Sequence, residues 1–510
     1  MPKLPQTLFS TAIASTFLLA ACSATKPVEY TEEETRQRIL HDQAQMYANQ
    51  EPVTTPITFY EAAARALKYN LDYRLKLMES ALASDLRDVS SHEMLPRVVA
   101  SAGYAGRNND SGGTSIGIED REQSLRASTS EERYRQLYGL GMSWSLLDFG
   151  VAYYRTQQKS DQILMAEERR RKVAQNVLQD VRNAYWRALS AQRLMPQVDR
   201  LLVRTHQALL SARQAENQGL LPRQEVLAYQ RALLDSIYLL TVRRQDLEFA
   251  RAELSALMSL PPGSRLVLAD DTEPVLPQIA PDMDKLEQLS LKHRPEIMEE
   301  WYRKRVNEND LKIAKAQLWP NVTLDYGYKY DSNKFNYNSD WTETGVQVSM
   351  NLLRLLQLPS LNSAAESQTK TDDMRRVALS MAILTQVRVG TLRYQLARQE
   401  VEFADQSLQV DESLLSYAEK ARSTSYGSGL EVIRAEGRYL LSRYQREAAY
   451  SSAQAAWGRL YNSVGLDTLP KEIEQHDIKT LAREIQRTLD DQERSNLLVS
   501  TQGTPNAVYP

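Results

Sequence analysis

The sequence has almost no cysteine: Cys22 is the single one among 510 residues. A chain with one cysteine cannot form an internal disulfide, and a mature chain in which Cys22 is modified has no free thiol. Long apolar runs are also missing, because no stretch after Cys22 approaches the roughly 18 consecutive apolar residues of a transmembrane helix. We therefore expect neither a disulfide framework nor a membrane-spanning helix in the mature chain.

Motifs for catalysis and metal binding are absent as well. The five histidines show no metal-ligand spacing; they are His41, His92, His206, His293 and His476. No Ser/His/Asp or Cys/His set, phosphate-binding loop or HExxH motif occurs. The sequence therefore predicts a protein that is not an enzyme and that has no catalytic residues, no cofactor and no metal site.

No charge of one sign dominates the chain. Lys and Arg number 62 against 65 Asp and Glu, with a formal net charge of −3 and both signs interleaved. A nucleic-acid partner is not expected without a basic stripe, and ERRRK (168–172) is typical of a solvated helix face. The 26 tyrosines against 7 phenylalanines favour surfaces that meet two media, since tyrosine is amphipathic.

The N-terminus has the layout of a secretory signal: Lys3, an apolar stretch from Leu8 to Ala21, and small residues before a cleavage point. The ending LAAC resembles a bacterial lipobox, which implies cleavage before Cys22 and a lipoprotein carrying diacylglycerol and palmitate there. Ser23 is compatible with sorting to the outer membrane. An ordinary signal peptide with a coincidental cysteine is the alternative.

The chain contains an internal repeat. Leu67-Lys68 aligns with Leu291-Lys292, and the same spacing carries Pro96 and Val98 onto Pro320 and Val322. A shorter spacing then holds over more than a hundred residues; it aligns Ser143 with Ser349, Val181-Arg182 with Val387-Arg388, and Glu225-Val226 with Glu431-Val432. The first copy is therefore longer by about 18 residues within 105–135, a polar, turn-rich stretch that we expect to be an exposed loop.

Each copy changes its hydrophobic period in the same order. The first is expected to contain a helix over 58–94, strands over 97–106 and 137–147, a long helix over about 151–215 and a shorter one over 223–259. The second is expected to contain a helix ending at 318, strands over 321–331 and 343–353, a long helix over about 362–424 and a helix over 430–463. The predicted division is 1–21 signal peptide, 22–56 linker, 57–262 first repeat, 263–282 inter-repeat linker, 283–467 second repeat and 468–510 tail. We expect the tail to be polar, without a clear apolar face, with a short helix and then disorder.

Helix lengths predict a thin layer. At 1.5 Å per residue the long helix of a copy is close to 100 Å, and its two shorter helices placed end to end reach about 90 Å. Two short helices can therefore lie beside one long helix. Helices of this length are typical of coiled-coil packing.

The strands alternate with unusual strictness, as in LYGLGMSWSLLDFG (137–150). Apolar residues lie on one face and Gly, Ser or polar residues on the other, as in a strand of an outer-membrane barrel. A soluble antiparallel sheet with one wet face has the same pattern, but no other apolar element remains to cover this one. The residues expected to face lipid are Tyr138, Leu140, Met142, Trp144, Tyr326, Tyr328, Val346 and Val348.

Four strands cannot form a closed barrel, yet a sheet in hydrocarbon has no free edge. The chain must then associate, with eight strands as a dimer or twelve as a trimer. Side chains fill a barrel of about eight strands, and the small inward residues favour a roomy lumen. The sequence therefore favours a homotrimer with a twelve-stranded β-barrel, continued by a long α-helical barrel in the periplasm.

The lipobox, the repeat and the alternating strands together resemble the TolC-type outer-membrane efflux channels. ITFYEAAARALKYNLDYR (57–74) is similar to the opening of that family, RPEI with LWPNVTLDYGY (318–328) to its second-copy counterpart, and SWSLLDFG (143–150) to its strand-to-helix exit. The resemblance spans about 57–467. It implies a mainly α protein with membrane β, lodged in the outer membrane and reaching into the periplasm, which works with a periplasmic membrane-fusion adaptor and an inner-membrane transporter.

The resemblance also implies roles for the two helix turns farthest from the strands. Family members contact adaptor hairpins at glycine-bearing turns, which match Gly219, Leu220, Gly427, Gly429 and Leu430. An acidic residue after the second turn lines a periplasmic gate, and Glu431 matches it. A second acidic position is Arg434 here, which suggests a salt-bridged gate, and Glu225 is the first-copy equivalent. Helix-start residues beside a positive helix terminus are the alternative for both glutamates.

A lipid-anchored coiled-coil scaffold or adaptor in the periplasm is the rival function. It accounts for the lipid and the long helices, but not for two copies of an alternating strand pair. Within the channel class, efflux and secretion remain open, and so do drugs, metal ions, a secreted protein and a polysaccharide as cargo.

Overall fold

The computed structural model describes residues 29–466 and 477–494, apart from 115, 125, 219–221, 265, 271–272, 280–281 and 424–428. The chain divides into two compact units, Met1–Gln50 and Glu51–Pro510. In the first unit, helix α2 (Glu32–Met46) begins at a capping box formed by Thr31 and Glu34, so the predicted linker 22–56 contains a helix. The predicted signal peptide and Cys22 lie outside the described residues. Every element discussed below belongs to the second unit.

The second unit has one order of elements twice. The first copy comprises α3 (Phe59–Tyr69), α4 (Leu71–His92), β1 (Arg97–Gly106), β2 (Gly112–Gly113), β3 (Ser128–Thr129), β4 (Tyr134–Ser145), α5 (Leu146–Asn217) and α6 (Arg223–Leu257). The second comprises α7 (Met283–His293), α8 (Pro295–Ala316), β5 (Asn321–Asp331), β6 (Asp340–Ser349), the 3-10 helix η1 (Leu352–Gln357), α9 (Leu358–Ser423) and α10 (Gly429–Val464), followed by α11 (Ile478–Arg494).

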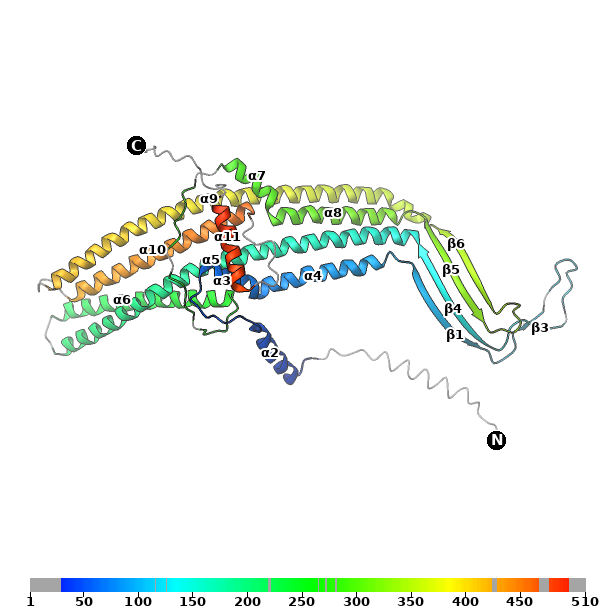
Figure 1. Cartoon of the computed structure of the whole chain (residues 1–510), viewed down its shortest axis with the longest axis horizontal. Helices are drawn as coiled ribbons and strands as arrows, with labels where there is room; N and C mark the ends of the chain where they lie inside the picture. Colours follow the sequence, from blue (N-terminus) through cyan, green and yellow to red (C-terminus); the bar gives the residue numbers. More distant parts are fainter. Residues whose placement is uncertain are drawn as a thin grey trace, which may run out of the picture. The chain divides into compact units, whose positions relative to one another are not determined.

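Helices α5 and α9 are 72 and 66 residues long, which corresponds to about 100 Å each. Beside the sheet, neighbouring helices follow the order α4, α5, α8, α9; at the other end the order is α6, α5, α10, α9. Each long helix is thus flanked by two shorter helices placed end to end, as their lengths predict (Figure 1). The result is a layer one helix thick.

Both boundaries of two strands differ from the sequence prediction, and these strands begin three residues early, at Tyr134 and Asp340. Strand β4 ends at Ser145, not at residue 147, because the Ser145 hydroxyl accepts a hydrogen bond from the Asp148 N–H at 3.0 Å and caps α5. Leu147, which breaks the alternation, therefore belongs to the helix. Strand β6 covers Asp340–Ser349 instead of 343–353, since a 3-10 turn begins at Leu352. The expected 105–135 loop is exposed and contains the short pair β2–β3.

The predicted opening helices are each broken once. Asn70 ends α3 and caps α4, and Arg294 ends α7 before Pro295 opens α8. The short members α3 and α7 lie across the long helices near their middle, together with α11 (Figure 1). The largest apolar core is found where α3 and α11 meet α5, and Ile57, Tyr185 and Leu189 are among its buried residues.

The tail prediction is wrong in one respect. Helix α11 has a distinct apolar face, since Ile478, Leu481, Ile485 and Leu489 are all buried, and the helix packs against α3. Spacings of three and four residues produce that face. The predicted disorder falls on residues that the structure does not describe.

The linker between the repeats crosses the helical layer and is held there by hydrogen bonds. Side chains of α5, α9 and α10 hydrogen-bond its main chain, so its path does not depend on its own sequence alone. The contacts are Gln192 with both main-chain groups of Leu268 at 2.8 Å, Tyr450 with the Pro274 carbonyl at 2.8 Å, and Tyr394 with the Pro277 carbonyl at 2.7 Å.

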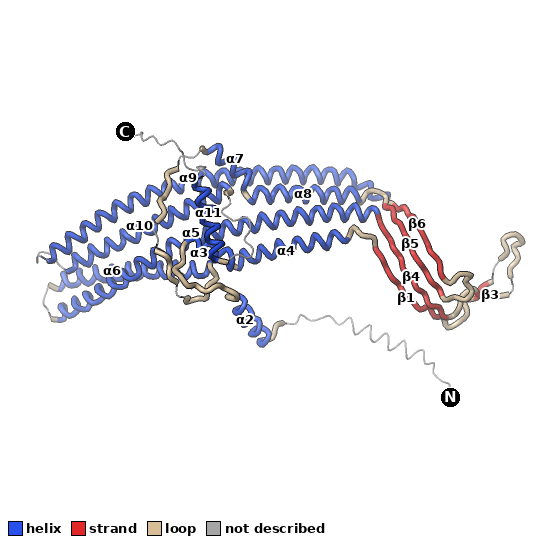
Figure 2. Tube along the Cα trace, viewed as in Figure 1, coloured by secondary structure: helices blue, strands red, loops and turns tan. Residues whose placement is uncertain are grey.

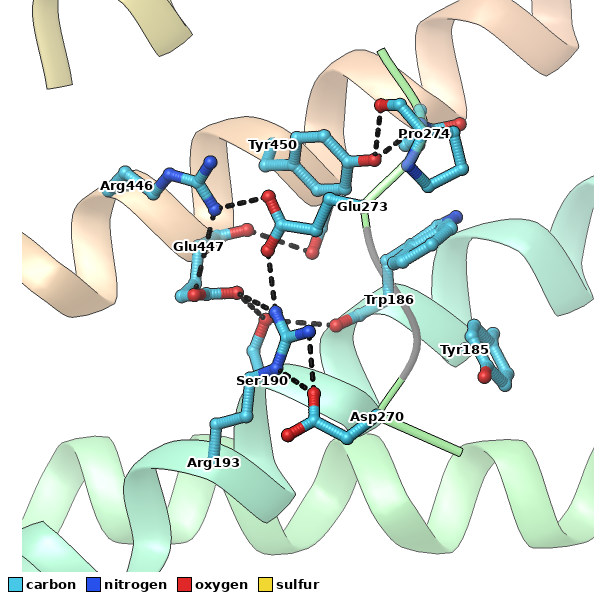
Figure 3. Close-up of polar contacts among 12 residues, drawn as sticks. Tyr185, Trp186, Ser190, Arg193, Asp270, Glu273, Pro274, Arg446, Glu447 and Tyr450 are labelled. Carbon is cyan, nitrogen blue, oxygen red and sulfur yellow. Dashed lines mark hydrogen bonds and ion pairs between the residues drawn. The ribbon is translucent and has the colours of Figure 1, made fainter. Parts of the chain in front are cut away.

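An ion-pair network fixes the same linker to both repeats (Figure 3). Glu273 of the linker lies 2.5 Å from Arg193 of the first repeat and 2.6 Å from Arg446 of the second. Glu447 is buried nearby and lies 3.6 and 3.7 Å from the same two arginines. Burial, with Glu273 as a neighbouring charge, raises the pKa of Glu447. Glu273 is therefore the carboxylate that joins the repeats, whereas the charge on Glu447 is disfavoured.

Glu273→Gln is expected to lower the free energy of unfolding by about 2 kcal/mol, because two largely buried guanidinium groups lose their shared partner. The matched variant Glu447→Gln is expected to be neutral or stabilising at neutral pH. Thermal denaturation of both variants, followed by circular dichroism in detergent, checks this. An equal decrease in stability in the two variants contradicts the conclusion that Glu273, and not Glu447, joins the repeats.

The pH dependence of Glu447→Gln gives a second check. The raised pKa of Glu447 means that the folded chain binds this proton more tightly than the unfolded chain. Its contribution to stability is present below the unfolded-state pKa and is lost as the pH rises through the folded-state pKa. The difference in melting temperature, variant minus parent, should therefore increase from about pH 4 upward.

Candidate functional site

The four long strands form one antiparallel sheet in the order β1-β4-β5-β6. Leu140 lies opposite Tyr328, Met142 opposite Tyr326, and Leu324 opposite Val346. Residues directly opposite each other share a face. Val98 of β1 lies opposite Met142, so the same face continues across all four strands.

One face of the sheet is open and mainly apolar, with the polar residues Asp340, Thr342 and Thr344 in the first half of β6. All eight residues predicted to face lipid lie on it by this register. Seven are exposed, with fractions from 39% for Met142 to 72% for Val346, and Trp144 is half-buried. Among the described elements, none covers this face of the sheet (Figure 2).

The other face carries mostly small and polar residues, and its large apolar residues include Val99, Leu137 and Trp341. Gly141 pairs with Gly327, and Gly345 pairs with Asp325. A Cβ atom added at Gly141 would meet no atom of the chain within 4 Å, so local packing does not require glycine there. An ion pair between Lys329 and Glu343 lies on the same face. This face suits contact with water.

Both edges of the sheet are unpaired within the described chain. Strand β1 pairs only with β4, and β6 pairs only with β5. Each therefore leaves one row of backbone N–H and C=O groups without a strand partner.

The edge helices carry apolar seams that the sequence analysis missed. On α9, exposed apolar residues recur at every seventh position; they are Val389, Leu396, Phe403, Val410 and Tyr417. On α6, the exposed apolar residues are Leu227, Leu234, Tyr238 and Phe249. A seven-residue repeat is the coiled-coil signal, so a search for it along the long helices could have found the α9 seam.

A polar hollow of about 1170 Å³ lies between α5, α6, α9 and α10. Its walls include Asn183, Arg187, Arg393 and Arg459. Tyr185, whose hydroxyl bonds the linker, lies on the opposite side of α5, because residues two apart in a helix differ by about 200°. The hollow therefore opens on the face of the layer away from the linker.

The ends of α5 and α9 and the starts of α6 and α10 lie together at the end of the layer farthest from the sheet (Figure 1). Of the predicted adaptor-contacting residues, Gly219, Leu220 and Gly427 lie outside the described residues, and Gly429 and Leu430 begin α10.

The predicted gate residues flank these turns. Glu225 is exposed in the first turn of α6, and Glu431 and Arg434 are exposed at the start of α10. No ion pair joins Glu431 to Arg434 in the described part of the chain. Arg434 instead lines a hollow of about 220 Å³ with Arg438 of its own helix and Leu240 of α6.

Two features of the described residues concern other functions. No group of three or more His, Cys, Asp or Glu there is arranged to hold a metal ion. Among the helices of that same part of the chain, none combines the length and the apolar character needed to cross a bilayer.

Comparisons with known proteins agree with this arrangement. Solved structures with a similar fold include the Campylobacter jejuni CmeC outer membrane channel, with 12% identity, a TM-score of 0.64, and coverage of 88% of this chain and 95% of that one. The open state of the Neisseria gonorrhoeae MtrE outer membrane channel has 14% identity, a TM-score of 0.61, and coverage of 82% and 94%. The outer membrane protein VceC from Vibrio cholerae has 15% identity, a TM-score of 0.59, and coverage of 80% and 96%.

No curated protein sequence matches the chain. The model of the outer membrane efflux protein family matches residues 62–259 and 286–466, which together make up most of the chain and correspond to its two copies. That family is one of transport channels, not of enzymes. The chain belongs to the outer membrane efflux protein family.

Proposed function

We propose that three copies of this chain form the outer-membrane channel of a tripartite efflux or secretion system. The observation that carries the proposal is the sheet, which has one open apolar face, one small and polar face, and two unpaired edges. In hydrocarbon, a spanning sheet has to close so that no backbone group is left unpaired. Copies of the same chain can provide that closure.

Strand directions support closure between identical copies. All neighbouring strands are antiparallel, so β1 and β6, the first and fourth in the order, also run in opposite directions. The β6 edge of one copy can therefore pair with the β1 edge of the next in the same antiparallel pattern. Three copies give twelve strands, and the glycines of the inner face leave a lumen open where about eight strands would be filled by side chains.

The helical seams support the same ring. Helix α9 runs toward the turns and α6 runs away from them, so residues at equal depth can meet between copies. Tyr417 of α9 lies six residues before the end of its helix, and Leu227 of α6 lies four after its start. Val410 and Leu234 each lie seven residues farther from the turns. Leu396 and Phe249 lie farther still from the turns, at nearly the same depth as each other. Apolar residues thus match along an antiparallel pair.

The route for cargo follows from this ring. The apolar face of the sheet meets lipid, with tyrosine suited to the depth of the headgroups, and the glycine-bearing face lines a pore. The helical layer continues the pore into the periplasm, with the polar hollow on its inner wall. A periplasmic adaptor contacts the two turns, and an inner-membrane transporter delivers cargo through the constriction near Glu225, Glu431 and Arg434.

Lipidation of Cys22 is part of the proposal and rests on the sequence LAAC alone. It anchors each copy to the outer membrane beside the barrel. A lipid-anchored scaffold, the rival reading, leaves the apolar face of a four-stranded sheet in water, which disfavours it.

The register between copies is tested by the cysteine pair Val410→Cys and Leu234→Cys. Oxidation is expected to link neighbouring chains, giving linked dimers and trimers on denaturing gels, because the two positions lie at one depth. The control pair Val410→Cys and Phe249→Cys is about 22 Å out of register and should stay unlinked. Equal linkage of both pairs contradicts the register.

The gate is tested by Arg434→Glu, which places a second carboxylate one helical turn from Glu431. Repulsion among the six carboxylates of a trimer is expected to widen the constriction and raise single-channel conductance several-fold at low salt. The gain should shrink at about 1 M salt, where the Debye length is about 3 Å. Planar-bilayer recording measures it, with Arg434→Gln as the control. A conductance equal to that of the control contradicts a role at the constriction.

A further inference from the structure

A cluster of exposed leucines lies where the sheet joins the long helix α9. The turn η1 carries four of them, Leu352, Leu353, Leu355 and Leu356, with exposed fractions of 68%, 75%, 42% and 76%. Soluble surfaces rarely expose contiguous large apolar side chains in this way. Neither the gate nor the lumen described above uses them. We call these four residues, with Met350 and Trp319, the collar patch.

The geometry of η1 spreads the leucines over two faces. With three residues per turn, Leu352 and Leu355 share one face and Leu353 and Leu356 share a second. The third face holds Arg354 and Gln357. A neighbouring copy at the β6 edge can cover one side of such a short turn. A seam for a partner helix repeats along one face, as on α9, whereas the collar patch surrounds most of its turn.

A hollow of about 700 Å³ adjoins the turn. It brings together Leu352, Leu353 and Met350 with Trp319, which precedes β5 and is 71% exposed. Arg354 lies on the same hollow. Its other lining residues are Leu147 and four uncharged polar residues, Gln317, Asn321, Ser349 and Asn351. The hollow thus combines an apolar part with a polar part that contains one cation, which suits an acyl chain and the phosphate of its headgroup.

Charge along the sequence points the same way. No Asp or Glu occurs between Glu343 and Glu366, and Arg354 is the single charged residue in that interval. A segment that lies on a phospholipid surface avoids carboxylates and tolerates arginine. The charged helix faces farther along α9 do not share this composition.

The position of the turn matches the edge of a membrane. Val346, Val348 and Met350 continue the apolar row of β6, and Leu352 follows Ser349, the last strand residue, by three positions. At about 3.3 Å per residue, the turn lies within the headgroup zone that borders the hydrocarbon core. Tryptophan is enriched at this depth, which accounts for an exposed Trp319.

We propose that the collar patch binds phospholipid of the periplasmic leaflet of the outer membrane, with acyl chains against its leucines and a phosphate near Arg354. The inference rests on the proposed barrel, because it needs the sheet to be in the membrane. Three copies then hold the periplasmic rim of the barrel at a fixed depth. The collar patch is separate from the lipid on Cys22.

Spin labels on introduced cysteines test this in the full chain, reconstituted in phosphatidylethanolamine and phosphatidylglycerol vesicles. Leu353→Cys is the main variant and Leu356→Cys repeats the test if the first does not fold. Val346→Cys on the sheet is the lipid control, and Val275→Cys, 91% exposed on the inter-repeat linker, is the water control. The unmodified chain is treated with the same label in parallel, and any signal from copies whose Cys22 carries no lipid is subtracted.

The collar label is expected to collide several-fold more often with oxygen, and less often with a water-soluble nickel complex, than the label at Val275→Cys. The ratio of its oxygen collisions to its nickel collisions should approach the ratio measured for the label at Val346→Cys. Access to nickel at the collar overturns the proposal. Exclusion of both reagents overturns it in favour of contact with a second copy. If Val346→Cys itself reports water, the proposed barrel fails; a lipid signal there with a watery collar leaves the barrel standing and removes only the collar.

Discussion

The structure depends on one constraint: every backbone N–H and C=O in a membrane needs a partner. A sheet of four strands satisfies its two inner strands and leaves β1 and β6 with one open side each. In water those groups bind solvent, but in hydrocarbon each unpaired group costs several kcal/mol. The edge strands of one chain therefore need partners from other copies of the chain. Its alternating faces, its antiparallel edges and its seams on α6 and α9 are all consistent with a closed ring.

The helical layer extends the sheet beyond the membrane. Long helices α5 and α9 continue strands directly, with Ser145 capping one junction and η1 forming the other. Shorter helices fill the spaces between them end to end, so the layer stays one helix thick over about 100 Å. Such a layer cannot bury a large core, and the main apolar cluster forms where α3 and α11 cross it. The ion pairs of Glu273 fasten the linker at that level and join the two repeats.

Much of this architecture can be predicted from the sequence because it is periodic. Alternation locates the strands and their faces, and the repeat tests each assignment twice. The predicted end of a strand is wrong where a capping side chain sets it, as at Ser145. The strand and helix patterns overlap at that point, so the apolar pattern alone does not locate the boundary. The apolar face of α11 was missed because it consists of four apolar residues spread over about three turns, and most other residues of the helix are polar. The α9 seam takes up one position in seven of a long, mainly polar helix, so its apolar residues stand out little from the sequence around them. Contacts of Glu273 with Arg193 and Arg446 join segments far apart in sequence, so no local pattern reveals them.

The mass of the purified complex tests the central claim most directly. Native mass spectrometry of the detergent-solubilised protein, with β structure confirmed by circular dichroism, counts the chains in the particle that contains the closed sheet. The account predicts three chains per particle. A folded particle with one or two chains and the same β content contradicts it, because four or eight strands do not enclose the lumen that the glycine-bearing face implies.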